Sequence, residues 1–104
     1  MVVNDELEEI LENRIKLDEF INVENYELLK GNFHKLITTQ LGSRVLQSCI
    51  SKTNKDLLIL IFSEIQYNLS QVIVNQYGNY FCQKFFTCLP FTYRVKFLES
   101  VLSY

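Results

Sequence analysis

Two short stretches of the chain place polar side chains four residues apart, a spacing that puts them on one face of a helix. The stretches are "QLGSRVLQ" at residues 40–47 and "QYGNYFCQ" at residues 76–83. Gln47 follows Ser43 by four residues, and Gln83 follows Asn79 by four. A glutamine amide donates and accepts hydrogen bonds at once, so it can pair with the Watson–Crick edge of a nucleobase. Ser43 and Asn79 would add a second point of fixation.

Each stretch also carries a side chain that can stack on a base. Arg44 directly follows Ser43, and Tyr80 directly follows Asn79. A guanidinium plane or a phenol ring gives a base a flat surface to lie on. The two stretches form either a solvated polar face or a surface that reads bases. The candidate base-edge residues are Ser43, Gln47, Asn79 and Gln83, and the candidate stacking residues are Arg44 and Tyr80.

The two stretches belong to a longer internal repeat with an offset of 36 residues. Aligning residues 31–66 with 67–102 gives five identities, and 13 of the 15 apolar residues of the first copy meet an apolar residue in the second. Random placement would give about eight such matches, since the second copy has 20 apolar residues among 36. A period of this length is typical of a solenoid, whose units bury their apolar faces against their neighbours.

The apolar periodicity predicts three short helices in each copy. We expect them at residues 31–38, 42–52 and 54–66 in the first copy, and at 67–75, 78–88 and 90–103 in the second. Phe81, Cys82, Phe85 and Phe86 would pack behind the polar face of the second middle helix.

Residues at the helix ends support this division of the chain. Gly42 and Gly78 are expected at the bend before each middle helix, where glycine relieves backbone strain. Thr53 and Asn54 can cap the third helix of the first copy, and Pro90 suits the first turn of its counterpart.

Composition is consistent with one domain of helices. The chain has 104 residues, 48% of them hydrophobic, with three Gly and one Pro. Its longest unbroken apolar run has six residues, so we expect no membrane span. The three cysteines form no CxxC pair, and we expect buried, reduced thiols in an intracellular protein.

Charge divides the chain into an acidic lead-in and a mildly basic body. Residues 1–30 hold nine acidic and three basic residues, a net −6, whereas residues 31–104 hold three acidic and seven basic residues, a net +4. This asymmetry hints at a polyanionic partner for the body. Residues 6–30 do not match the repeat, and we expect one or two amphipathic helices there that cover the exposed end of the first copy.

"GSRVLQ" and "GNYFCQ" resemble the RNA-reading helices of the Pumilio-homology (PUF) family of RNA-binding repeat proteins. The resemblance covers about residues 31–104, with both motifs in the correct phase. It implies an all-α, right-handed α-solenoid of three-helix repeats: an acidic N-terminal cap (1–30), repeat 1 (31–66) and repeat 2 (67–104). It also implies binding of single-stranded messenger RNA and control of its translation and decay in the cytoplasm.

The resemblance assigns a base to each repeat. Ser43 and Gln47 imply adenine, Asn79 and Gln83 imply uracil, and Arg44 and Tyr80 would stack. Because the family reads RNA antiparallel to its repeats, the two sites imply 5′-UA-3′. The family's domain normally has eight repeats, whereas two are present here. The last helix, with Leu98 and Leu102, would then need further repeats or a protein partner over its apolar face.

Other classes of function find less support in the sequence. The single histidine, His34, has no carboxylate or thiol at a telling spacing, so we expect no enzyme, no metal site and no cofactor. The rival hypothesis is a protein-binding α-solenoid, because other helical repeats of similar length hold peptides. A nucleolar branch of the family, with less sequence preference, is a further alternative. We interpret Gln40 and Gln76 as structural or helix-capping residues.

Overall fold

The computed structural model describes residues 26–103, and every regular element within them is helical. A short helix α3 (Tyr26–Leu29) comes first. The first copy of the repeat forms α4 (Phe33–Ile37), α5 (Gln40–Cys49) and α6 (Lys55–Ile65). The 3₁₀ helix η2 (Gln66–Asn68) spans the boundary between the copies. The second copy continues with α7 (Leu69–Val74), α8 (Gly78–Cys88) and α9 (Phe91–Ser103). The predicted all-α class is confirmed for these residues.

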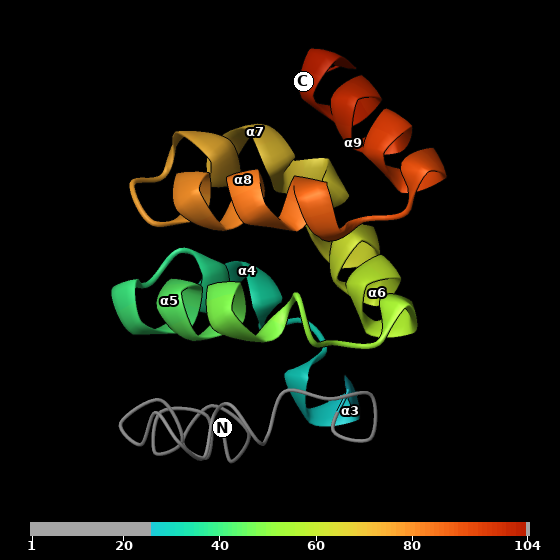
Figure 1. Cartoon of the computed structure of the whole chain (residues 1–104). Coiled ribbons are helices and arrows are strands. Elements are labelled where there is room, and N and C mark those ends of the chain that lie inside the picture. Colours follow the sequence, from blue (N-terminus) through green and yellow to red (C-terminus); the bar gives the residue numbers. More distant parts are fainter. Residues whose placement is uncertain (1–25, 104) are drawn as a thin grey trace.

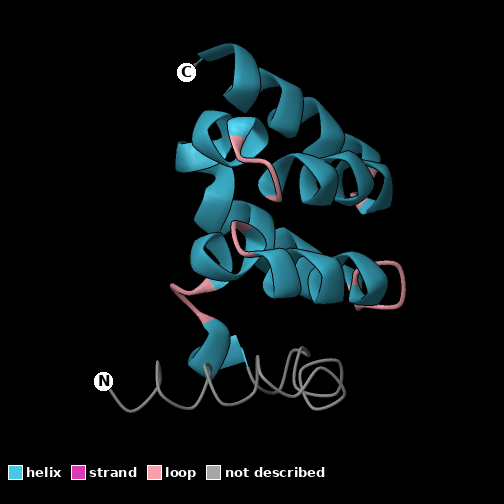
Figure 2. Cartoon of the chain, turned by 90° about the vertical axis from the view of Figure 1, so that its left-hand side faces the viewer, coloured by secondary structure: helices cyan, strands magenta, loops and turns pink. Residues whose placement is uncertain are grey.

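The two copies are stacked in chain order. Figure 1 shows α4 and α5 in one layer, α7 and α8 in the next, and α6 and α9 together on one side of both. The middle helices α5 and α8 pack against each other across the boundary between the copies. In the view turned by 90° the same layers follow one another from α3 to the C-terminal end (Figure 2). This stacking places the two polar stretches side by side.

The two middle helices begin in the same way, at positions 36 residues apart. Thr39 Oγ1 accepts a hydrogen bond from the backbone N–H of Gly42, at 3.2 Å. Asn75 Oδ1 accepts from the N–H groups of Tyr77 and Gly78, at 2.8 and 2.9 Å. Capping therefore falls to Thr39 and Asn75, and the capping role considered for Gln40 and Gln76 was wrong. Because Thr39 caps it, α5 starts two residues earlier than predicted.

The glycines of the middle helices allow the backbone of each helix to lie close to the helix before it. Neither Gly42 nor Gly78 has a positive φ, so the prediction that they relieve backbone strain was wrong. A methyl group on Gly42 would overlap the carbonyl of Leu36, and one on Gly78 would overlap the carbonyl of Val72. Each glycine lets the middle helix start directly against the end of the preceding helix. The left-handed conformation occurs instead at Gly31, with φ 82°.

The third helix of the first copy is capped as predicted by Asn54, whose Oδ1 accepts from the N–H of Asp56 at 2.7 Å. Thr53 instead donates its hydroxyl to the Cys49 carbonyl at the end of α5, at 2.8 Å. Pro90 lies one residue before α9, and its carbonyl accepts from the N–H of Arg94 at 3.0 Å. These bonds fix the two turns that reverse the chain between middle and third helices.

A single hydrophobic core runs through both copies. Phe62 of α6 stacks on Phe97 of α9 and meets the edge of Tyr93, with ring centroids 6.4 and 6.0 Å apart. Behind the polar face of α8, Phe81 and Phe85 are buried and stacked at 5.0 Å, as the sequence predicted. The apolar side of each middle helix is therefore held in the core, so its polar side must face outward.

The predicted N-terminal cap at residues 6–30 lies mostly outside the described residues. Of this segment, the structure describes α3 and the residue after it. Leu29 is buried, and the Tyr26 ring stacks on Phe33 with a centroid separation of 6.4 Å. These contacts hold α3 against the first copy.

One stretch, Lys55–Val74, is long and apolar enough to cross a membrane by length and composition alone, with a mean hydropathy of 1.5. In the structure it is divided among α6, η2 and α7. Leu57, Ile61 and Ile65 of this stretch are buried in the core. Packing between the helices thus accounts for part of its apolar composition.

Candidate functional site

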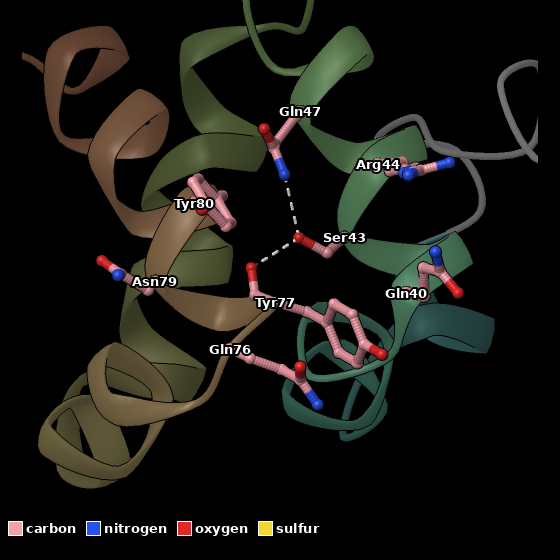
Figure 3. Close-up of a pocket in the computed structure, with 8 residues that line it drawn as sticks. All are labelled: Gln40, Ser43, Arg44, Gln47, Gln76, Tyr77, Asn79 and Tyr80. Atoms are coloured by element: carbon pink, nitrogen blue, oxygen red, sulfur yellow. Dashed lines mark hydrogen bonds between the residues drawn. The ribbon is translucent and has the colours of Figure 1, made fainter.

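A pocket of about 560 Å³ lies between α5 and α8 (Figure 3). It brings together five of the six residues singled out from the sequence, contributed by both copies. The five are Ser43, Arg44, Gln47, Asn79 and Tyr80. The sixth, Gln83, is exposed one turn further along α8. Five of the six residues thus lie where the two copies meet.

Ser43 lines this pocket, and its hydroxyl group is hydrogen-bonded to other residues of the chain. Only 2% of the residue is exposed. Its hydroxyl donates to the Tyr77 carbonyl at 2.8 Å, which ties α5 to the start of α8. The same oxygen accepts from Nε2 of Gln47 at 3.0 Å. Ser43 therefore orients Gln47 and joins the two copies.

Gln47 keeps hydrogen-bonding capacity toward the pocket. Its amide N–H₂ group has two hydrogens, of which one is given to Ser43. Its second N–H and its Oε1 remain available to a ligand as one donor and one acceptor. The bond to Ser43 already fixes the orientation of the side chain. Figure 3 shows the Gln47 amide at one end of the pocket, with its nitrogen toward Ser43.

The equivalent pair on α8 is more open. Nε2 of Gln83 donates to Oδ1 of Asn79 at 3.2 Å, the same i to i+4 bond as in the first copy. Both side chains are exposed. Asn79 retains its N–H₂ group as donor, and Gln83 retains its oxygen and one N–H. This pair can thus offer a donor, an acceptor and a second donor.

The two stacking candidates, Arg44 and Tyr80, come from neighbouring helices and line the same pocket. Both are exposed, and Tyr80 keeps 63% of its surface. An exposed tyrosine ring on a packed helix has apolar surface available to a flat ligand. The pocket therefore combines an oriented amide with flat side chains from both copies.

A second, mainly apolar hollow of about 360 Å³ lies at the far end of the chain, beyond α8. Asn79 and Gln83 line it together with apolar residues of α7, α8 and α9. Leu98, on its rim, is 51% exposed, whereas its counterpart Phe62 in the first copy is buried under Tyr93 and Phe97. The second polar pair thus faces an edge that in the first copy is covered by another repeat.

Three further residues line the first pocket and were not assigned to it from the sequence. They are Gln40, Gln76 and Tyr77. A signal for two of them was present, because Gln40 and Gln76 are identical residues at equivalent repeat positions. Position in the sequence alone did not separate a capping glutamine from one that lines a pocket.

Positive charge is sparse at the site. Arg44 is the one cationic side chain among the residues that line the pocket. Elsewhere, Lys55 donates to the Cys88 carbonyl at 2.7 Å, Lys96 lies over the Tyr93 ring at 4.8 Å and Arg94 over the Phe91 ring at 6.0 Å. Most of the basic excess of the body is therefore placed away from the pocket.

The thiols are not arranged for chemistry. Cys49 and Cys82 are buried and Cys88 is half-buried, and none of the three forms a disulfide bond within residues 26–103. Burial raises the pKa of the Cys82 thiol to about 12, so this group stays protonated. Residues 26–103 contain no group of three side chains able to hold a metal ion.

Comparison with known proteins identifies the same two copies of the repeat. The model of the Pumilio-family RNA binding repeat matches twice, at residues 32–66 and 68–102, which nearly coincide with the two copies. Two Pumilio domain-containing proteins of Schizosaccharomyces pombe are similar, one 29% identical over 80 residues and the other 26% identical over 99 residues. These matches cover 77% and 94% of the chain but only 12% and 13% of the relatives. The chain thus spans about an eighth of their length. No solved structure matches significantly.

Proposed function

The chain belongs to the Pumilio family of RNA-binding repeat proteins, and from this premise we propose that it binds single-stranded RNA with one base read by each repeat. The observation that supports the proposal is the pocket between α5 and α8, which is lined by Gln47, with its amide bonded to Ser43, together with Arg44 and Tyr80. Stacking holds a base in such a slot regardless of its identity, and the amide selects among bases.

The first repeat is proposed to read adenine. Adenine presents one donor, its amino group, beside one acceptor, its N1. Gln47 offers the complementary acceptor and donor, with Ser43 fixing the orientation of the amide. Because the Ser43 hydroxyl already donates to the Tyr77 carbonyl, we expect Gln47 to make the main contribution to selecting adenine over other bases.

The second repeat is proposed to read uracil. Uracil presents an acceptor, a donor and an acceptor along its Watson–Crick edge. The Asn79–Gln83 pair offers a donor, an acceptor and a donor in its internally bonded state. With RNA antiparallel to the repeats, as in the family, the two sites together would read 5′-UA-3′.

The chain is proposed to be part of a longer right-handed solenoid. The apolar hollow beyond α8 and the exposed Leu98 and Leu102 support this, since the equivalent edge of the first repeat is covered by the second. The short span relative to the curated relatives is consistent with missing repeats. In such a protein the RNA would be messenger RNA, and the role would be cytoplasmic control of its translation and decay. The alternative is a protein-binding solenoid, which the same apolar edge would favour.

Base selection can be tested by fluorescence anisotropy on the chain with two short RNAs that differ only in UA or CC at the read positions. We expect affinity in about the high micromolar range, because two stacked bases contribute only about 1–3 kcal/mol each before association costs. Gln47→Ala should remove the preference at the adenine position, and Gln83→Ala the preference at the uracil position. Gln71→Ala, an exposed glutamine on α7 away from the pocket, is the matched control.

A change of specificity would be stronger evidence than a loss. Gln47→Glu replaces a donor–acceptor group with a carboxylate that only accepts, which suits the two neighbouring N–H donors of guanine. This variant should therefore prefer UG over UA. Binding that ignores these bases in the parent chain would refute base reading, and a folded chain that binds no RNA would favour the protein-binding alternative.

A further inference from the structure

One rim of the pocket is formed by the side chains of Gln40, Gln76 and Tyr77, to which neither the base-reading proposal nor a side-chain hydrogen bond in the described residues assigns a role. We call it the glutamine rim. Figure 3 shows the Tyr77 ring between the two amides, on the opposite side of Ser43 from Gln47. All three residues line the same pocket as Gln47 and Tyr80. A ligand stacked on Tyr80 would extend toward this rim.

The two glutamines have no structural task in the described part of the chain. Thr39 and Asn75 cap the middle helices in their place. Both Gln40 and Gln76 are exposed, and no hydrogen bond holds either amide among residues 26–103. Two identical, exposed amides at equivalent positions of diverged repeats, both lining one pocket, are explained more simply by a ligand than by packing.

The chemistry of the rim disfavours a phosphate group. The rim contains no cation, and the nearest pocket cation is Arg44. Backbone N–H groups at a helix start can bind anions. Here, however, those of Gly42, Tyr77 and Gly78 are given to Thr39 and Asn75. The rim is left with neutral groups that both donate and accept.

Groups of this kind match a hydroxyl, which also donates and accepts. Every RNA nucleotide carries a 2′-OH on the ribose that bears its base, and this is the group by which proteins tell RNA from DNA. We propose that the glutamine rim binds the 2′-hydroxyl of the nucleotide whose base occupies the pocket. The inference rests on the proposed function and adds to it a sugar subsite that makes the chain prefer RNA.

The test uses the full chain labelled with ¹⁵N and RNAs containing UA, titrated by NMR because this method measures weak binding. One RNA is unmodified, one carries a single 2′-deoxyadenosine at the read position, and one carries a single 2′-deoxynucleotide outside UA. Side-chain N–H₂ signals of Gln40 and Gln76, assigned from the Gln40→Ala and Gln76→Ala variants, report contact directly. Gln71→Ala serves again as the matched control.

We expect the deoxyadenosine to weaken binding by about three- to tenfold, the usual effect of one lost hydrogen bond. In the Gln40→Ala or Gln76→Ala variant, the unmodified RNA and the RNA with 2′-deoxyadenosine should bind with nearly equal affinity. The preference of each variant for UA over CC should persist. A deoxy substitution outside UA should have no such effect, and Gln71→Ala should behave like the parent.

Three results would overturn the sugar subsite. The first is UA preference in the parent without sensitivity to the deoxyadenosine, which would leave the proposed function intact. The second is a glutamine effect that tracks salt concentration, which would indicate phosphate contact. The third is absence of RNA binding or of any UA preference, which would remove the proposed function as well.

Discussion

At the scale of residues, equivalent positions of the two repeats differ because their neighbours differ. Ser43 is buried and bonded to the carbonyl of Tyr77, a residue of the next repeat, whereas Asn79 is exposed at an uncovered edge. Both still make the same bond to the glutamine four residues on. The glutamine is thus the same in both repeats, whereas the residue that it bonds differs with the burial of its position.

Tyr80 should contribute to RNA binding and not to stability, because 63% of its surface is exposed. We expect Tyr80→Ala to weaken RNA binding by about 1–3 kcal/mol, the value of one base–aromatic stack. Tyr80→Phe should retain most of the affinity. Tyr67→Ala, at a tyrosine 66% exposed and outside the pocket, is the control. Anisotropy titration measures the effect, and equal losses for Tyr67→Ala and Tyr80→Ala would contradict it.

The buried Cys82 thiol should make stability fall at high pH. Its pKa is raised from 9.0 to about 12 by burial, so folding favours the protonated form. This contribution is fully present below pH 9 and is lost as the pH rises toward 12. Between pH 8 and 10 we expect a loss of about 1 kcal/mol in the free energy of unfolding. Urea unfolding of the parent and of Cys82→Ala measures it, and an identical pH dependence in both would show the assignment to be wrong.

At the scale of elements, each repeat needs its middle helix to start close to the preceding one. Gly42 and Gly78 allow this approach, and Thr39 and Asn75 satisfy the first free N–H groups. The sequence showed the glycines but not their purpose, because a tight contact with the Leu36 or Val72 carbonyl depends on how two helices meet.

Two glycines should respond differently to the same substitution. Gly78→Ala places a methyl group against the Val72 carbonyl, and we expect a loss of about 1–3 kcal/mol from this overlap. Gly31→Ala meets no atom but must adopt φ 82°, at a cost of about 1–2 kcal/mol.

Asparagine separates the two mechanisms, since it tolerates the left-handed conformation but adds bulk. Gly31→Asn should therefore be milder than Gly31→Ala, whereas Gly78→Asn should be at least as damaging as Gly78→Ala. Urea unfolding of the four variants gives the comparison. Parallel behaviour at both positions would rule out the distinction between contact and conformation.

At the scale of the whole molecule, most of the basic side chains lie outside the pocket between α5 and α8. The body is net basic, yet Arg44 alone among its cations lines the pocket, with Lys84 exposed on the same helix as Tyr80. Lys55 and Lys96 are engaged elsewhere. If the chain binds RNA as proposed, we expect the affinity to come mainly from contacts to bases, with little contribution from phosphates.

RNA binding should depend only weakly on salt. If Arg44 and Lys84 neutralise one or two phosphates, the slope of log K against log salt should be about −0.7 to −1.4 for a single strand. Anisotropy titrations of a UA RNA at several salt concentrations give the slope. Arg44→Gln should make it shallower, and Lys35→Gln, on α4 away from the pocket, should not. A slope steeper than about −3 would mean that phosphates dominate.

The sequence by itself determined the repeat, the helices and the polar face. The 36-residue offset and the apolar pattern are periodic, local signals, and a helix turns such a pattern into a buried side and an exposed side. The four-residue spacing of polar side chains singled out Ser43, Arg44, Gln47, Asn79, Tyr80 and Gln83. The resemblance of "GSRVLQ" and "GNYFCQ" to Pumilio reading helices indicated the family, which the family model confirms. The capping residue Asn54 was likewise visible from its position before an apolar run.

Only the tertiary structure decided which of these residues are buried, which line the pocket and which hold the helices together. The burial of Ser43, the glutamine rim and the close approach at Gly42 and Gly78 all arise where one helix meets another. Contacts between residues 34 positions apart, such as the bond from Ser43 to Tyr77, leave no periodic trace in the sequence. They depend on the packing of α5 against α8, which the pattern along either helix does not specify.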